Sequence, residues 1–176
     1  MMRELTSRGE QSPWRGPADN ELGMPVPWRM TLLSTPAAWL RAGDFVAYST
    51  GFSFETWGLL ELADEPPSGH LLSETADTLL NTLQIGLGLA GGRELTMAGE
   101  VGPEPPDPPA LSRRRHLQGG GRYLGWRDFW WLWPLPPAGP ILLICSWEAM
   151  GVAPSESTFD SGPLLEGARS ALRYWE

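Results

Sequence analysis

WRDFWWLWPLPPAGPILLICSW, residues 126–147, joins an aromatic run to an apolar run through a proline-rich segment. This stretch holds five of the ten tryptophans in the chain. Successive side chains of a β-strand point to opposite faces, so a strand over residues 126–133 carries large rings on both faces. We predict an aromatic strand, a stiff proline turn over residues 134–140, and an apolar strand that pairs back on the first.

The two faces of the aromatic strand have different expected roles. One face fills the core, where each buried ring contributes about 150–250 Å² of apolar area. The other face is either covered by another element, such as a C-terminal helix with Trp175, or exposed as a surface that binds a partner. The candidate residues for such a surface are Trp126, Trp130, Trp131 and Trp133.

Size and charge limit the possible functions. A chain of 176 residues is most simply one domain, and it is long enough to bury a core without a disulfide or a metal. The net charge of −8 argues against general binding to nucleic acid or to anionic membranes. All thirteen basic residues are arginines, which reflects either a GC-rich genome or selection for guanidinium chemistry.

The single cysteine, Cys145, lies in the apolar run 141–145 and excludes a disulfide within the chain. A free cysteine in such a run is typically a small buried hydrophobic residue, although a nucleophile is the alternative. The N-terminal residues lack the apolar run of a signal peptide, and no run is long enough to span a membrane. We therefore expect a cytoplasmic protein.

Alternation of apolar and polar residues predicts further strands before the aromatic one. In the strand predicted over residues 52–62, Phe52 and Phe54 share one face and Trp57 lies on the other. Residues 79–89 and 93–98, joined by Gly91 and Gly92, predict a β-hairpin. The other predicted strands cover residues 26–33, 37–40 and 44–49.

These elements predict a mainly β fold, an antiparallel two-sheet sandwich of about seven or eight strands with one C-terminal α-helix. Residues 1–23 are polar and lack any period, so we expect a flexible N-terminal arm before a single domain over residues 24–176. Residues 63–78 are expected to form a loop, with a short helical turn over 73–80. Residues 99–121 predict a mobile loop, and residues 162–175 predict the terminal helix.

Motifs for catalysis, metal binding or cofactor binding are not recognisable. His70 and His116 fall in predicted loops, far from any metal-ligand spacing. There is no Gly-x-Ser-x-Gly elbow. Residues 86–91 match Gly-x-Gly-x-x-Gly but lie in a predicted strand and not before a helix, so we attach no phosphate site to them. We expect no catalytic residues, no metal and no cofactor.

Arg113, Arg114 and Arg115 form the densest positive run and are candidate binding residues. They could hold an acidic partner or a phosphate. Alternatively, they balance the acidic piece just before them, which contains Glu104 and Asp107.

Four segments resemble a group of small uncharacterised proteins from actinobacterial genomes. They are AYSTGFSF at residues 47–54, FWWLWPLPPAGP at 129–140, CSWEAMGV at 145–152, and the closing helix at 168–175. The resemblance implies a β-rich single domain from residue 25 onward. It implies no activity, and no catalytic or binding residue is carried over.

Three functional hypotheses remain. The first is a non-catalytic interaction module that holds a protein partner, or a second copy of itself, through its aromatic and proline-rich face. The second is a small-ligand binder, for instance for carbohydrate, with tryptophans as a stacking platform. The third is a small enzyme with a loop-built site in which His70 or His116 is the general base.

Overall fold

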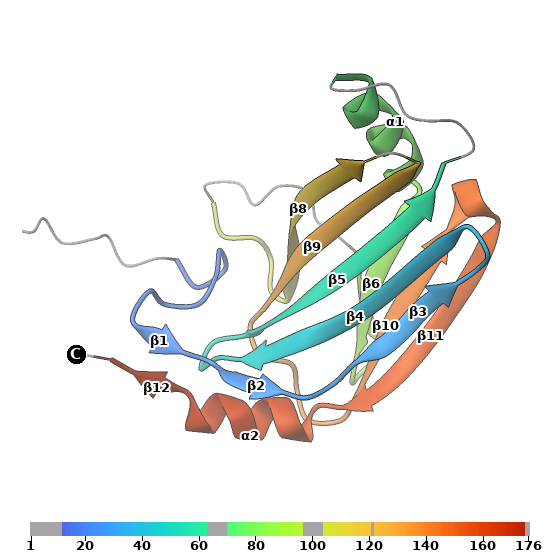
Figure 1. The fold of residues 1–176 in the computed structure, drawn as a ribbon. Coiled ribbons are helices and arrows are strands. Elements are labelled where there is room, and N and C mark those ends of the chain that lie inside the picture. The colour runs from blue at the N-terminus through green and yellow to red at the C-terminus, as the bar shows by residue number, and fades with distance from the viewer. Residues whose placement is uncertain (1–11, 63–69, 97–103, 121, 175–176) are drawn as a thin grey trace, which may run out of the picture.

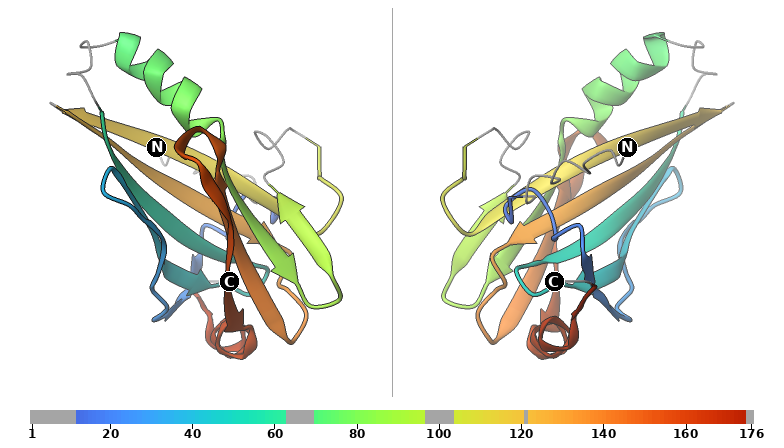
Figure 2. Two further views of the ribbon diagram at one scale, coloured as in Figure 1. Left: turned by 90° about the vertical axis from the view of Figure 1, so that its right-hand side faces the viewer. Right: turned by 90° about the vertical axis from the view of Figure 1, so that its left-hand side faces the viewer.

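The computed structural model describes residues 12–62, 70–96, 104–120 and 122–174. These residues form two antiparallel sheets packed face to face, which confirms the predicted sandwich (Figure 1). The sheets hold six and four strands, more than predicted. Figure 2 shows them as separate layers, with α1 (His70–Leu80) beside one end and α2 (Gly162–Ser170) beside the opposite end.

The larger sheet has the order β2-β4-β5-β9-β8, and β3 also pairs with β4. Its long central strands, β4, β5 and β9, alternate buried and outward residues almost without interruption, as half-buried strands do. The strands are β2 (Met24–Val26), β3 (Met30–Ser34), β4 (Ala38–Ala47), β5 (Phe52–Glu61), β8 (Ala110–Gly120) and β9 (Tyr123–Trp133).

The smaller sheet has the order β11-β10-β6-β7. Its strands are β6 (Leu83–Leu89), β7 (Arg93–Thr96), β10 (Pro140–Trp147) and β11 (Val152–Asp160), with the short 3-10 helix η1 (Glu148–Met150) before the last. The predicted hairpin is confirmed as β6 and β7, and Gly91 and Gly92 adopt the positive φ values its turn requires. It begins at Leu83 and not at residue 79, because α1 continues to Leu80.

The predicted pairing within residues 126–147 is wrong. β9 pairs with β5 and β8, whereas β10 pairs with β6 and β11 in the other sheet. The proline-rich segment 134–140 therefore crosses from one layer to the other. Packed sheets lie about 10 Å apart, a gap that a stiff, extended proline segment spans readily. Trp126 of β9 and Trp147 of β10 face each other across the core, with ring centroids 5.4 Å apart.

The core between the sheets is largely aromatic. Phe45, Phe52 and Phe54 are fully buried, and the Phe45 and Phe54 rings stack at 5.2 Å. The Phe54 ring also stacks on Trp130, with the centroids 5.6 Å apart. The prediction that Phe52 and Phe54 share one face of a strand is thus confirmed, and this face is the buried one.

The predicted mobile loop over residues 99–121 is also wrong for its second half. Residues 110–120 form β8, which pairs with β9 along its whole length from Ala110↔Trp133 to Gly120↔Tyr123. Local composition concealed this strand because its stabilising partners come from β9 and lie outside the segment. Residues 97–103 and 121 lie outside the described residues.

Both ends of the described chain differ from their predictions. Residues 12–23, expected in a flexible arm, contact the larger sheet, where the Pro13 carbonyl accepts a hydrogen bond from Trp131 Nε1 at 2.9 Å. Helix α2 ends at Ser170 and not at residue 175, since Ala171 is extended and the chain continues into β12 (Leu172–Arg173). β12 pairs with β1 (Glu21–Leu22). Residues 1–11 and 175–176 lie outside the described residues.

Candidate functional site

The four tryptophans predicted as a binding surface are mostly buried. Trp126 and Trp130 point into the core and are 3% and 1% exposed. Trp131 and Trp133 lie on the outer face of β9, but the N-terminal residues cover them. Trp131 is 6% exposed beneath the Pro13 carbonyl, and the Trp133 ring is in edge contact with Trp14 at 6.3 Å. These rings are therefore not an open platform.

A different set of side chains forms an exposed ladder on the outer face of the larger sheet. The pairing register places Arg41 of β4 beside Trp57 of β5, Trp57 beside Arg127 of β9, and Arg127 beside His116 of β8. Because all four positions are in register on one face, their side chains cross the sheet in a single row.

Rings and guanidinium groups alternate in this row. The Arg41 Cζ lies 4.5 Å from the Trp57 ring centroid and 5.6 Å from that of Trp39. On the other side of Trp57, the Arg127 Cζ lies 5.5 Å from the Trp57 centroid and 4.8 Å from that of Phe129. Such cation–π contacts contribute about 0.5–1 kcal/mol each at exposed sites. The row is therefore held together by its own side chains.

This surface remains open to solvent in the described structure. Trp39 and Phe129 are each 38% exposed, and Leu59, which pairs with Trp39, is 44% exposed. His116 packs its ring edge against Phe129 at 5.6 Å. We call this surface the ladder face; its residues are Trp39, Arg41, Trp57, Leu59, Arg114, His116, Arg127 and Phe129.

Positive charge dominates the ladder face. Arg127 donates a hydrogen bond from Nε to Glu55, and this bond raises the pKa of the Arg127 guanidinium above its ordinary value. Arg114 is exposed and has no ion-pair partner among the described residues. The face thus carries three arginines, Arg41, Arg114 and Arg127, and the carboxylates of Glu55 and Asp44 both act on Arg127.

The run 113–115 is not one cluster, because strand alternation sends its members to opposite faces. Arg114 lies on the ladder face, whereas Arg113 and Arg115 point to the inner side of β8. Arg115 donates from Nε and Nη2 to both carboxylate oxygens of Asp128, at 2.7 and 2.8 Å. Asp128 is fully buried. Of the two arginines on the inner side of β8, Arg115 has an ion pair, and Arg113 has none among the described residues.

Sequence reasoning missed most of the ladder face. The strand predicted over residues 52–62 already placed Trp57 and Leu59 opposite the buried Phe52 and Phe54. Arg127 and Phe129 alternate with buried residues in the same way along β9. In both strands, the rings and arginines of the ladder face lie at outward positions that alternate with the buried residues, and this alternation could have located the ladder face. Alternation alone does not show which of the outward rings are exposed, because the N-terminal residues cover some of them.

Two of the groups considered for catalysis, His116 and Cys145, lie in different sheets. His116 lies on the ladder face beside Phe129, and α1 begins at His70. Cys145 is fully buried in β10, and this burial raises the pKa of its thiol to about 11. No group of three or more His, Cys, Asp or Glu side chains among the described residues could hold a metal ion.

We expect the Cys145 thiol to resist alkylation in the folded protein. With a pKa of about 11, only about one thiol in a thousand is ionised at pH 8, and the thiolate is the reactive form. Iodoacetamide at pH 8 should leave native protein unmodified while urea-unfolded protein gains one adduct by intact mass. Equal modification of the two samples would contradict this burial.

None of the helices in the described part of the chain is long and apolar enough to cross a membrane. Comparison with protein-family models, with curated proteins and with solved structures finds no match. The resemblance to actinobacterial proteins therefore stays a prediction.

Proposed function

We propose that this chain is a non-catalytic interaction module that binds an acidic segment of a protein partner through the ladder face. The observation that carries the proposal is the half-buried row of alternating rings and guanidinium groups across β4, β5 and β9, flanked by the exposed Trp39, Leu59 and Phe129. Tryptophan and arginine are enriched among the residues that contribute most to protein–protein binding. The proposal places this activity in the cytoplasm, as the sequence predicts.

Charge supports an acidic partner. The chain has a net charge of −8, yet the ladder face holds three arginines, and the two carboxylates that act there, Glu55 and Asp44, both lie against Arg127. Arg114 has no anionic partner among the described residues, so a carboxylate can approach it without displacing one. Complementary charge across an interface raises the association rate and selects the partner.

The ring geometry favours a protein over a nucleic acid or a carbohydrate. Bases and sugars stack on open ring faces. Arg41 and Arg127 approach the Trp57 ring from the two neighbouring strands, so guanidinium groups already pack against this ring.

The test is selection of short peptides from a random display library on the immobilised protein, followed by affinity measurement on synthetic peptides. We expect the selected peptides to be rich in Asp and Glu. Arg114→Glu should weaken their binding by about tenfold or more, because it places a like charge on the partner. Arg93→Glu is the matched control, since it makes the same charge change at an exposed position on β7.

Three results would contradict the proposal. The selected peptides could lack acidic residues, or Arg114→Glu could weaken binding no more than Arg93→Glu does. Tighter binding of single-stranded RNA than of any acidic peptide would assign the ladder face to nucleic acid instead. Light scattering across a concentration series measures the molar mass of the protein in solution. Self-association that Arg114→Glu abolishes would show that the partner is a second copy of this chain.

A further inference from the structure

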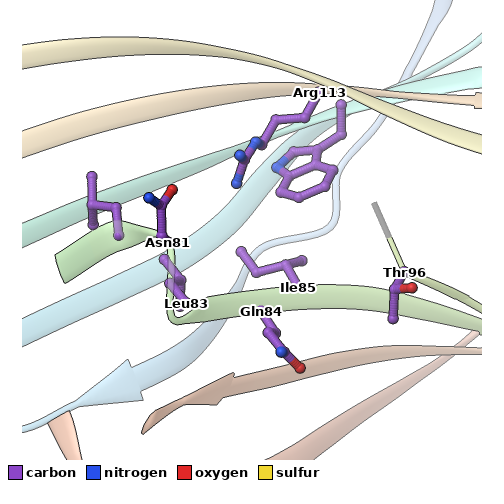
Figure 3. A pocket seen from close by; sticks show the side chains of 8 residues that line it. Asn81, Leu83, Gln84, Ile85, Thr96 and Arg113 are labelled. Carbon is purple, nitrogen blue, oxygen red and sulfur yellow. The ribbon is translucent and has the colours of Figure 1, made fainter. Parts of the chain in front are cut away.

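A second feature lies on the opposite side of β8 and does not depend on the ladder face. A pocket of about 290 Å³ opens between the two sheets, where the end of α1 leads into β6 (Figure 3). Leu83 and Ile85 of β6 provide an apolar wall, and Arg113 of β8 lies across from them. Trp130 of β9 also lines the pocket. Pockets for small molecules range upward from about 300 Å³, so this one suits a ligand of few atoms.

Arg113 is the one charged side chain among the residues that line the pocket. Its Cζ lies 5.7 Å from the centroid of the Trp130 ring. That ring is held in place, because Trp130 Nε1 donates to Thr56 Oγ1 at 3.0 Å and the other ring contact is the stacked Phe54. The guanidinium therefore rests on a fixed surface.

Arg113 forms no ion pair with a carboxylate of the described residues. The charge of Asp128 reaches Arg113 and partly opposes the lowering of its pKa, but both Asp128 oxygens accept hydrogen bonds from Arg115. Burial lowers the pKa of Arg113, and the neighbouring positive charge of Arg115 lowers it further. A half-buried guanidinium that has lost part of its water gains more from an anion than an exposed one does.

The pocket offers one positive charge beside an apolar wall. Asn81, which Figure 3 shows on the same side of β6 as Arg113, adds an amide group that can donate a hydrogen bond. Gln84 lies on the other side of β6 and points away from Arg113. One cation balances a monoanion, whereas a phosphate dianion would keep an unbalanced charge in a partly apolar site.

We propose that this pocket binds a small organic monocarboxylate. The carboxylate accepts hydrogen bonds from the Arg113 guanidinium and the Asn81 amide, and the apolar body of the ligand packs against Leu83, Ile85 and Trp130. Arg113 selects for the charge, and the volume of the pocket selects for a short aliphatic chain or a single ring.

Benzoate and hexanoate are the probes, with benzamide as the uncharged counterpart of benzoate. Binding is followed by calorimetry and by the change in tryptophan fluorescence, because Trp130 lines the pocket. We expect both carboxylates to bind and benzamide to bind at least about tenfold more weakly. This comparison uses the unaltered protein and does not depend on the folding of any variant.

Two neighbouring substitutions complete the test. Arg113→Met keeps a long apolar side chain and removes the charge, so it should weaken benzoate binding by about tenfold or more. Arg114→Met makes the same change on the opposite face of β8 and should leave benzoate binding unchanged. The reverse pattern is expected for acidic peptides, so the two proposals can fail separately.

The proposal is overturned if benzamide binds as well as benzoate, or if folded Arg113→Met protein binds benzoate like the unaltered chain. Absence of binding by both carboxylates at their highest soluble concentrations also overturns it. Inorganic phosphate that binds more tightly than either carboxylate would show that the pocket prefers a different anion.

Discussion

Replacement of Gly58 by alanine is expected to lower the free energy of unfolding by about 3 kcal/mol, because the added methyl group overpacks the core. Gly58 of β5 pairs with Trp126 of β9, and a Cβ at Gly58 would overlap the Trp126 indole ring. The ring cannot move aside easily, since it is buried against Trp147. Urea unfolding followed by tryptophan fluorescence measures the loss.

Gly125→Ala is the matched control for this substitution. Gly125 also lies in the larger sheet, but the nearest atom to its added Cβ is the Gln118 carbonyl oxygen at 3.3 Å. We expect the stability of Gly125→Ala protein to change by less than about 1 kcal/mol. In a Trp126→Leu background, Gly58→Ala should cost much less than in the original chain. Equal losses in both backgrounds would show that the Trp126 ring is not the obstacle.

Asp128→Ala is expected to lower the free energy of unfolding by about 4 kcal/mol, the typical cost of removing one partner from a buried ion pair. Asp128 is fully buried and both of its oxygens accept hydrogen bonds from Arg115, whose side chain is 16% exposed. Loss of the carboxylate leaves the guanidinium in place with little water to replace its partner. Chemical denaturation measures this effect.

The exposed pair between Arg122 and Glu61 is the control for Asp128→Ala. Its side chains are 61% and 38% exposed, so Glu61→Ala should cost less than about 1 kcal/mol. Combining Asp128→Leu with Arg115→Met should recover most of the loss, because an apolar pair of similar size needs no compensating charge. A double variant that is no more stable than Asp128→Ala alone would contradict this interpretation.

Where the local pattern is regular, the sequence was sufficient to predict the structure. The alternation of Phe52 and Phe54 with polar residues predicted the strand β5 and put the two rings on one face. Gly91 and Gly92 marked the turn between β6 and β7. In both cases the decisive information lies within a few residues, so no knowledge of distant partners is needed.

Partners distant in sequence explain the errors. β8 has the composition of a loop, but β9 pairs with its backbone and Asp128 of β9 neutralises its Arg115. The apolar run 141–147 could pair with any neighbouring strand, and proximity in sequence suggested β9 wrongly. Only the pairing with β9 puts Arg113 and Arg114 on opposite faces, so a prediction of a loop over residues 110–120 cannot separate the two candidate sites.

The centre of the larger sheet has a kinetic consequence. β5 pairs with β9 from Phe52↔Leu132 to Glu61↔Tyr123, and α1, β6, β7 and β8 all lie between them in the chain. Pairing two segments so far apart in the chain closes a long loop. The conformational entropy of this loop is lost before the contacts between β5 and β9 can compensate for the loss. The order of assembly is therefore constrained: local hairpins can form early, but the sandwich closes only when β9 finds β5, which makes this protein a slow folder for its size.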